Sequence, residues 1–443
     1  MRTVVVVDHT GRGHAYADLF VRTNPDVTVH LAPGCTAIDE ERVVGVGGVD
    51  IYTPGPVVEY ALSVGADLAL VAHPRPLTEG FVDAFRAAGI PTIGPDRSAA
   101  RVESSKLFTK RLCDKYGIRT AAYRYFDSPG PALEYVRSAG RPLVVKGNES
   151  CQGNGVFVCE TADEAVHAVE RLMVERAWGP GGDSVIVEEK LVGREVLFFA
   201  IVGGEDHLML PMAVDYQRSD DGNTGVMCGG TGAFSPSPDE TPEQVERFET
   251  QMLRPLLAAM AAEGLRYTGV IYVGCMLDGD ELSLIEINAR MGDPEAEVVF
   301  PRITTDFVGV CRSVLDGTLG AHPPLAVSDE HFVNVVASQG PLREYRDGVL
   351  VKETPGWPYG EYAKGQPITG IERVDRASCR VFYGAVRADA DGRVVTDGGK
   401  CLNLVGRGPT LEDAAAAAYR GVAEIGFPGI RYRGDIGKAM PWD

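Results

Sequence analysis

The first twenty residues constrain the fold of this chain more than any other stretch. Residues 4–7 are four valines, residues 11–13 read Gly-Arg-Gly, and helix-like sequence then continues to Phe20. A strand, a glycine turn and a helix in this order are typical of a doubly wound α/β domain. Such a turn can direct backbone N–H groups at an anion. It lacks the Gly-x-Gly-x-x-Gly spacing, so it indicates a dinucleotide site only weakly.

The rest of the pattern divides the chain into three domains. Short strands expected between residues 27 and 94 complete an N-terminal α/β domain over residues 1–104. Residues 105–324 form a central domain of helices and longer strands, with a mobile lid lobe at about residues 120–190. Short strands and turns then predict a β-rich C-terminal domain over residues 325–443.

The central and C-terminal domains carry their own element signals. Helices are predicted over residues 161–174, 242–264 and 410–425, the first of them opened by a Thr-x-x-Glu capping box at Thr161. Strands are predicted over residues 184–191, 267–277, 281–287, 331–338, 349–353, 379–386, 393–396 and 402–407. The polar, glycine-rich residues 219–238 predict a long loop, which in a compact domain is usually functional.

The composition limits the possible partners. The 443 residues carry a net charge of −19, which argues against a nucleic-acid partner because phosphate binding needs a basic face. The nine cysteines have no metal-binding spacing, and no apolar run is long enough for a transmembrane helix. We therefore expect a cytoplasmic protein, a monomer or a homodimer, that acts on small molecules and not on a membrane.

The strongest chemical signal is the stretch over residues 284–295, which reads Leu-Ile-Glu-Ile-Asn-Ala-Arg-Met-Gly-Asp-Pro-Glu. Its apolar start predicts a buried strand, from which Glu286 and Asn288 leave the same face because they lie two residues apart. A carboxylate beside an amide oxygen suits Mg²⁺, which typically bridges nucleotide phosphates. Arg290 adds a planar fork for a carboxylate or a phosphate. An ordinary edge strand with a charged turn is the alternative explanation.

Two lysines precede this stretch at positions suited to phosphate. Lys106 lies in the first turn of a predicted helix, where its charge opposes the helix dipole unless an anionic ligand is near. Lys146 ends a predicted strand, and a glycine-containing loop over residues 147–155 follows it. The lysine can supply point charge, and a mobile loop can supply backbone N–H groups to phosphates. A solvated surface lysine is the simpler alternative for Lys106.

Acidic residues follow the next predicted strand. Residues 188–191 read Glu-Glu-Lys-Leu, and Glu195 comes shortly after them. Carboxylates at a strand end can accept hydrogen bonds from ribose hydroxyls, and an extended backbone can pair with the edge of an adenine. Solvated surface charges are an equally simple alternative.

The order of these features resembles the ATP-grasp superfamily, in which two β-rich lobes hold ATP between them. Over nearly the whole chain, the sequence resembles the phosphoribosylamine–glycine ligase (glycinamide ribonucleotide synthetase) family. The resemblance is carried by residues 105–110, 187–191, 230–236, 267–274, 286–295 and 433–437. It implies an α/β multidomain ATP-grasp fold, with an N-terminal doubly wound pre-ATP-grasp domain and a β-rich C-terminal domain.

The resemblance also implies an ADP-forming ligase that uses ATP with Mg²⁺ or Mn²⁺. A carboxylate attacks the γ-phosphate to give an acyl phosphate, and an amine then displaces phosphate to form an amide. The residues implied for ATP are Lys106, Lys146, Glu188, Glu189, Lys190, Leu191 and Glu195. The metal is assigned to Glu286 and Asn288, and the catalytic roles fall to Arg290 and Lys146. The residues implied for the amino-acid donor are Asp215, Arg218, Arg290 and Asp293.

Four stretches depart from the motifs of this family. Residues 11–14 read Gly-Arg-Gly-His and lack the glutamate of the usual Gly-Gly-Arg-Glu-His, and residues 73–77 read His-Pro-Arg-Pro-Leu in place of Gly-Pro-Glu-Ala-Pro-Leu. Residues 215–218 and 153–155 each lose a lysine. The first two departures fall at strand ends where the resemblance places the phosphoribosylamine acceptor. The expected acceptor residues are therefore Arg12, His14 and Arg75.

This pattern of departures favours a changed amine acceptor. We expect a ligase of specialised metabolism that joins an amino-acid carboxylate to a non-purine amine or a second amino acid. Arg75 would favour an acceptor that carries an anion, because an arginine fork matches a carboxylate or phosphate. Two alternatives remain, namely an authentic phosphoribosylamine–glycine ligase of purine biosynthesis and a catalytically inactive nucleotide-binding scaffold.

Overall fold

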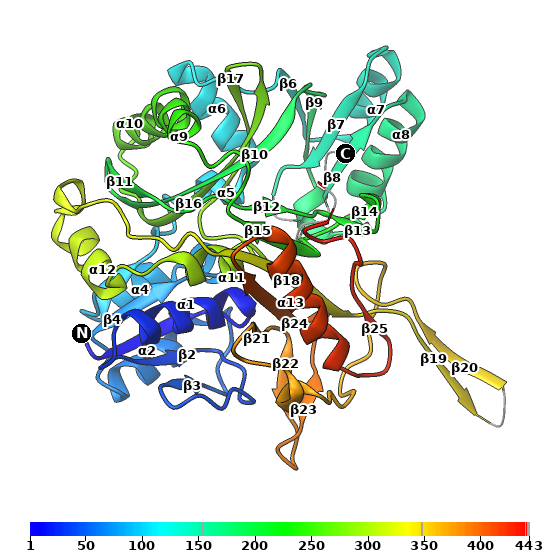
Figure 1. Cartoon of the computed structure of the whole chain (residues 1–443). Helices are drawn as coiled ribbons and strands as arrows, with labels where there is room; N and C mark the ends of the chain where they lie inside the picture. Colours follow the sequence, from blue (N-terminus) through cyan, green and yellow to red (C-terminus); the bar gives the residue numbers. More distant parts are fainter. Residues whose placement is uncertain (150, 152–154, 347–348, 439, 441–443) are drawn as a thin grey trace.

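The N-terminal part of the chain is a parallel sheet covered by helices (Figure 1). The computed structural model describes residues 1–149, 151, 155–346, 349–438 and 440. The strand order is β3-β2-β1-β4-β5, with β1 (Thr3–Val7), β2 (Thr28–Leu31), β3 (Val43–Gly45), β4 (Leu68–Val71) and β5 (Thr92–Ile93). The helices are α1 (Gly11–Thr23), α2 (Pro54–Ser63), α3 (Pro74–Glu79), α4 (Phe81–Ala87) and α5 (Arg101–Ser104). The predicted doubly wound α/β arrangement is therefore confirmed.

A separate lobe follows helix α6 (Lys106–Tyr116) and stands at the upper right of Figure 1. Its antiparallel sheet has the order β6-β9-β7-β8, with β6 (Tyr123–Phe126), β9 (Val185–Glu189), β7 (Leu143–Gly147) and β8 (Val156–Cys159). Helices α7 (Pro129–Ser138) and α8 (Ala162–Val169) pack on this sheet. Four positions of the loop expected to be a mobile lid, residues 150 and 152–154, lie outside the described residues.

The second half of the central domain is a sheet of long antiparallel strands. Its order is β11-β10-β16-β17, with β11 (Asp206–Met209), β10 (Arg194–Gly203), β16 (Thr268–Asp278) and β17 (Glu281–Asn288). The tight turn predicted between the last two strands is confirmed. Helices α9 (Pro242–Phe248), α10 (Arg254–Ala262), α11 (Ala296–Val299) and α12 (Phe307–Asp316) complete this region.

The predicted long loop over residues 219–238 is wrong. Strands β13 (Arg218–Asp220) and β14 (Thr224–Met227) form a hairpin there, and β15 (Gly232–Ser235) follows it. Gly222 and Asn223 have φ angles of +67° and +53°, so the chain reverses within a few residues. Alternation of apolar residues was too weak to reveal these strands because β14 is largely exposed.

The C-terminal part builds an antiparallel sheet onto β12 (Val214–Asp215) and β15. The order continues with β18 (His331–Gln339), β24 (Lys400–Gly408) and β21 (Cys379–Tyr383), and β25 (Ile430–Arg431) pairs with β18. Helix α13 (Leu411–Glu424) packs on this sheet. The hairpin of β19 (Leu342–Arg346) and β20 (Val349–Thr354) projects away from the body, and β22 (Val386–Ala388) pairs with β23 (Val394–Thr396).

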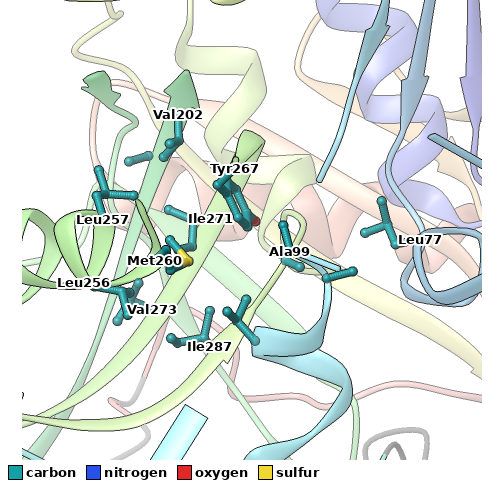
Figure 2. Packing of buried hydrophobic residues seen from close by; sticks show 14 of the residues in the cluster. Leu77, Ala99, Val202, Leu256, Leu257, Met260, Tyr267, Ile271, Val273 and Ile287 are labelled. Atoms are coloured by element: carbon teal, nitrogen blue, oxygen red, sulfur yellow. The ribbon is translucent and has the colours of Figure 1, made fainter. Parts of the chain in front are cut away.

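One hydrophobic core joins the N-terminal domain to the long-stranded sheet. Figure 2 shows side chains of β10, β16, β17 and α10 meeting side chains of the N-terminal domain, among them Val202, Ile271, Val273, Ile287, Leu256, Leu257, Met260, Leu77 and Ala99. This packing fixes the carboxyl ends of the N-terminal strands relative to β17, which carries the predicted metal ligands. Among the described residues, no helix is both long and apolar enough to cross a membrane.

Candidate active site

A cavity of about 370 Å³ lies between the lobe of β6–β9 and the long-stranded sheet. It brings together side chains from six parts of the chain that are far apart in sequence. The residues predicted for ATP, metal and donor that line it are Lys106, Lys146, Glu188, Glu189, Lys190, Leu191, Glu195, Glu286, Asn288, Asp215, Arg290 and Asp293. Of the predicted donor residues, Arg218 alone lies elsewhere, in the neighbouring cavity described below.

Two lysines share one buried carboxylate at the inner end of this cavity. Lys146 Nζ lies 2.9 Å from one oxygen of Glu188, and Lys110 Nζ lies 3.0 Å from the other. Burial alone would raise the pKa of Glu188, but the charges of Lys146 and Lys110 outweigh it and lower that pKa. The predicted ATP residue Glu188 therefore serves as a counterion for two lysines. Sequence reasoning missed Lys110, although it follows Lys106 by one helical turn.

Lys106 stands at the start of α6 with its ammonium group in the cavity. Ser105 caps the helix, since its hydroxyl accepts a hydrogen bond from the Phe108 N–H at 3.3 Å. Burial lowers the pKa of Lys106, and the nearby Glu286 carboxylate opposes that effect. Within the described part of the chain Lys106 makes no ion pair, so its charge is available to an anion.

Glu286 and Asn288 lie side by side on β17, as their spacing predicted. Asn288 Nδ2 donates to Glu286 Oε1 at 3.0 Å, and Arg290 donates to Asn288 Oδ1 at 2.9 Å. The described residues contain no cluster of three or more metal-binding side chains. One carboxylate and one amide oxygen fit Mg²⁺, which keeps several non-protein ligands, and do not fit a closed protein cage.

The carboxyl groups of Asp215 and Glu295 line the same cavity as Arg290. Asp215 Oδ1 is buried without a hydrogen-bond partner among the described residues. Burial first, and then the charge of Glu295, raise the pKa of Asp215 well above its usual value. The pKa of Glu295 is raised as well, with burial as the main cause. A cationic group bound between these two carboxylates would relieve both effects.

Glu195 also lines this cavity, close to Glu286. The protein packed around its carboxyl group, and then the charge of Glu286, raise the pKa of Glu195 to about 7. Gln217 Nε2 donates to Glu195 Oε1 at 3.5 Å. Among the described residues Glu195 makes no ion pair, although the charge of Lys146 acts to lower its pKa.

A second cavity, of about 920 Å³, opens next to the first. Both cavities are lined by Asp293, Val156, Val158 and Met227, so they meet at these residues. The wall from the N-terminal domain consists of His9, Thr10 and Gly11, and the wall from the C-terminal sheet includes Lys400 and Asn403. The lobe of β6–β9 contributes His167, Arg171 and Trp178.

The three predicted acceptor residues do not line either cavity. The Arg12 guanidinium is buried, where Nε donates to Asp8 at 2.7 Å and another nitrogen donates to the Met291 carbonyl at 3.2 Å. His14 is also buried, between Glu40 at 3.0 Å and the Tyr383 N–H, which donates to His14 Nδ1 at 3.0 Å. The polar atoms of both side chains are engaged by protein groups, among them Met291 and Tyr383 from distant parts of the chain, so the two acceptor assignments stay predictions without support from the cavities.

Arg75 faces away from the cavities. Its guanidinium lies 2.7 Å from Glu79 and 5.2 Å from the centre of the Tyr52 ring, and about half of the side chain is exposed. Its spacing of four residues from Glu79 on α3 explains this orientation. The inference that Arg75 selects an anionic acceptor therefore has no structural support.

Residues that sequence reasoning missed form the floor of the second cavity. Lys400 Nζ donates to the carbonyls of Gly229 and Asp293, each at 2.8 Å, and pairs with the Asp293 carboxylate. A Cβ atom on Gly11 would lie 2.2 Å from Asn403 Nδ2 and 2.3 Å from Glu297 Oε1, so either buried side chain would have to move to admit one. Lys400 and Asn403 contact segments that lie more than 100 residues away in sequence, such as Asp293. No local sequence motif predicts these contacts.

Comparisons with known proteins match the whole chain. Residues 2–103, 104–296 and 349–439 match the models of the N domain, the ATP-grasp (A) domain and the C domain of phosphoribosylglycinamide synthetase. The phosphoribosylamine–glycine ligase of Vibrio cholerae is 36% identical over 436 residues, which cover 98% of this chain and 97% of that protein. That of Caldanaerobacter subterraneus is 34% identical over 433 residues, covering 98% and 99% of the two chains.

Solved structures agree with these sequence matches. The crystal structure of phosphoribosylamine–glycine ligase from Thermotoga maritima superposes with a TM-score of 0.79 at 27% identity, covering 98% of this chain and 99% of that chain. The biotin carboxylase domain of Hydrogenobacter thermophilus 2-oxoglutarate carboxylase, solved with MgADP, gives a TM-score of 0.68 at 14% identity and covers 97% and 91% of the two chains. At that identity the second match shows the shared fold alone.

Proposed function

The chain belongs to the phosphoribosylglycinamide synthetase family of ADP-forming ATP-grasp ligases, and we propose that its own reaction joins glycine to phosphoribosylamine. The proposal rests mainly on two adjacent cavities that share Asp293 in their linings. One holds the lysines and the Glu286–Asn288 pair, and the other reaches the N-terminal strand ends. An activated carboxylate formed in the first cavity can thus be attacked by an amine bound in the second.

The relatives favour the purine-pathway reaction over a specialised acceptor. Relatives named phosphoribosylamine–glycine ligase match at 34–36% identity over almost their full lengths. The case for a changed acceptor rested on the departures at Arg12, His14 and Arg75. Because these side chains are engaged by other protein groups outside the cavities, their surroundings give no information on the acceptor. An inactive scaffold is disfavoured because the lysines and the Glu286–Asn288 pair are present in one cavity.

The donor is proposed to bind between opposite charges. The ammonium group of glycine would lie at Asp215 and Glu295, whose pKa values are raised mainly by burial. Its carboxylate would face Arg290, whose guanidinium also pairs with Glu103 at 3.0 Å and donates to Asn288. This arrangement points one carboxylate oxygen toward the place where the lysines hold phosphate.

The first chemical step needs positive charge around the transferred phosphoryl group. Lys106 and Lys146 would neutralise phosphate oxygens while a glycine carboxylate oxygen attacks the γ-phosphorus of ATP in line. Glu286 and Asn288 would hold Mg²⁺, which would supply further positive charge near the phosphates. Glu188 would keep Lys146 and Lys110 charged and oriented while the site is empty. The products of this step are glycyl phosphate and ADP.

The second step forms the amide bond. The amine of phosphoribosylamine attacks the carbonyl carbon of glycyl phosphate, the carbon–oxygen bond to phosphate breaks, and inorganic phosphate leaves. Lys400, fixed by Asp293 and the Gly229 carbonyl, lies at the junction where both substrates would meet. Its positive charge would stabilise the departing phosphate.

The proposed function is tested by ADP formation with glycine as donor. Freshly prepared phosphoribosylamine is compared, at equal concentration, with amino acids and simple primary amines as acceptors. We expect phosphoribosylamine to give the highest kcat/KM and equimolar ADP and glycinamide ribonucleotide. A higher kcat/KM with another amine would contradict the proposal and restore the changed-acceptor hypothesis.

A further inference from the structure

The second cavity reaches the point in the N-terminal sheet where the strand order reverses. Strand β1 lies between β2 and β4, so connections leave it in opposite directions on its two sides. In open parallel sheets, ligands bind at such a switch point, outside the carboxyl ends of the strands. His9 lies just beyond β1 and His73 just beyond β4, and their ring centres are 4.8 Å apart. A histidine pair therefore occupies the place where this fold positions a ligand.

Hydrogen bonds to the Asp8 carboxylate fix the turn that carries His9. One oxygen of Asp8 accepts hydrogen bonds from the Thr10 N–H and hydroxyl, each at 2.7 Å, and the other accepts from Arg12 Nε at 2.7 Å. Asp8 is buried, whereas His9 is exposed within the cavity. The backbone is thus fixed with the imidazole presented to a bound molecule.

The same turn explains the missing glutamate at position 13. A Cβ atom on Gly13 would lie 2.8 Å from the Asp8 Cβ and 3.0 Å from the Asp8 carbonyl oxygen. Contacts this short with a Cβ and a backbone atom are prohibitive, so an aspartate bridged in this way requires glycine at position 13. Asp8, His9 and Gly13 therefore form one structural unit, which serves to present His9.

We propose that His9 accepts the proton that the acceptor amine loses when it attacks glycyl phosphate. This inference rests on the proposed function. As the new carbon–nitrogen bond forms, the nitrogen becomes positively charged. An unprotonated imidazole nitrogen of His9 takes one proton, the carbon–oxygen bond to phosphate breaks, and phosphate leaves with that electron pair. The imidazolium then releases its proton to solvent or to the departing phosphate.

The surroundings of His9 keep its imidazole neutral and able to accept a proton. The protein packed around the ring lowers the pKa of His9, and so does the Arg12 guanidinium, while Asp8, Asp293 and Asp397 oppose them. Burial lowers the pKa of the neighbouring His73 to about 3, and the Arg75 N–H donates to His73 Nδ1 at 3.2 Å. His73 is therefore a neutral neighbour that adds no charge.

Other groups near His9 are engaged elsewhere. The Asp293 carboxylate pairs with Lys400, and Asp8 pairs with Arg12. Among the described residues that line this cavity, the other histidine is His167 on α8. His322 supplies a control outside the site, because it lines neither cavity and its ring contacts the carbonyl of the adjacent Pro323.

The experiment compares two reactions in the full-length His9→Asn, His9→Ala and His322→Asn variants. With MgATP and glycine saturating, one reaction uses phosphoribosylamine and the other uses hydroxylamine, a small uncharged nucleophile that can lose its proton to water. We expect His9→Asn to lower kcat for amide formation by about 10²-fold, within the usual range of a general base. Hydroxamate formation should change by less than about twofold, and His322→Asn should resemble the wild type in both reactions.

A rescue measurement separates proton transfer from a structural effect. Added imidazole should restore amide formation in His9→Ala in proportion to its neutral fraction, and it should leave the His322→Asn rates unchanged. The inference is overturned if His9→Asn keeps the wild-type kcat, if both reactions fall equally, or if imidazole restores nothing. If wild-type protein forms the hydroxamate but no glycinamide ribonucleotide, the proposed function itself fails and this inference fails with it.

Discussion

At the scale of single residues, charge pairing decides which side chains are available for chemistry. Arg12 and Asp8 lie four residues apart, and both are buried. The Arg12 guanidinium forms an ion pair with Asp8, so it is not available to the substrate for which the sequence suggested it. Lys106 lies in the same kind of environment without such a partner among the described residues. Lys106 is therefore the stronger candidate for direct contact with an anion, and Arg12 the weaker one.

The Asp8–Arg12 pair gives a prediction about stability and pH. Burial alone would raise the pKa of Asp8, but Arg12, His73, His9 and the Thr10 N–H together hold it well below its usual value. A carboxyl group with a lowered folded-state pKa stabilises the protein above its unfolded-state pKa, roughly 4, and loses that contribution as pH falls. Asp8→Asn should therefore cost about 3–5 kcal/mol at pH 7, because it leaves a buried arginine unpaired.

Urea unfolding at pH 7, 4, 3 and 2 measures the difference in unfolding free energy between wild type and Asp8→Asn. The difference in the free energy of unfolding between wild type and Asp8→Asn should be largest at pH 7 and should decrease as pH falls below about 4. Asp26→Asn, in an exposed turn, is the matched control and should unfold like the wild type. A difference in unfolding free energy that stays constant over this pH range would contradict the explanation by an Asp8–Arg12 ion pair.

Glu286 gives the prediction for the metal. Glu286→Ala should lower ADP formation by on the order of 10²–10⁴-fold, because a metal at developing phosphate charge contributes several kcal/mol. Folding should be unaffected, since Glu286 faces the cavity rather than the core. Glu281→Ala is the control on the same strand, where an exposed carboxylate pairs with Arg119. Steady-state ADP release across a Mg²⁺ titration is the measurement, and unchanged turnover in Glu286→Ala would remove the metal assignment.

The residues that could be predicted from sequence are those whose geometry is local. Glu286 and Asn288 share a face because strand side chains alternate, and Lys106 stands at a helix start because Ser105 caps it. The positions of Arg12, His14 and Arg75 outside the two cavities could not be foreseen from sequence, because they depend on partners such as Glu40, Tyr383 and Glu79. His9 and Lys400 were missed because neither belongs to a motif.

At the scale of elements, capping and periodicity were reliable guides. Strand β17 extends one residue beyond the predicted range 281–287, and α13 begins at Leu411, one residue after its predicted start. Helix α8 starts after the capping box of Thr161, and its predicted continuation to Val174 becomes a π-helical turn. The hairpin of β13 and β14 was missed because exposed strands carry little hydrophobic alternation.

The capping box of α8 yields a prediction for the lobe of β6–β9. The Thr161 hydroxyl accepts from the Glu164 N–H at 3.3 Å, and Glu164 accepts from the Thr161 N–H at 3.2 Å. Thr161→Ala should destabilise the first turn by about 1 kcal/mol, whereas Thr161→Ser retains the hydroxyl and should cost little. Hydrogen exchange of the α8 amides should be about fivefold faster in the alanine variant. Equal exchange in the two variants would mean that the cap contributes nothing measurable.

At the scale of the whole molecule, the site exists only because three regions of the chain meet. The N-terminal strand ends supply His9, β17 and its following turn supply Glu286 and Asp293, and β24 supplies Lys400. The α/β class and the three-part layout follow from periodicity and from the resemblance to a known family. The junction of the two cavities does not, because it depends on contacts such as Lys400 with Asp293 across 107 residues.

The central claim is that a carboxylate is activated by ATP in one cavity and captured by an amine in the next. The most direct test follows oxygen from glycine labelled with ¹⁸O in its carboxylate, with MgATP and phosphoribosylamine. Because the carbon–oxygen bond of glycyl phosphate breaks, we predict one ¹⁸O atom in inorganic phosphate for each glycinamide ribonucleotide formed, with unlabelled ADP. Phosphate without ¹⁸O, or label transfer without that product, would contradict it.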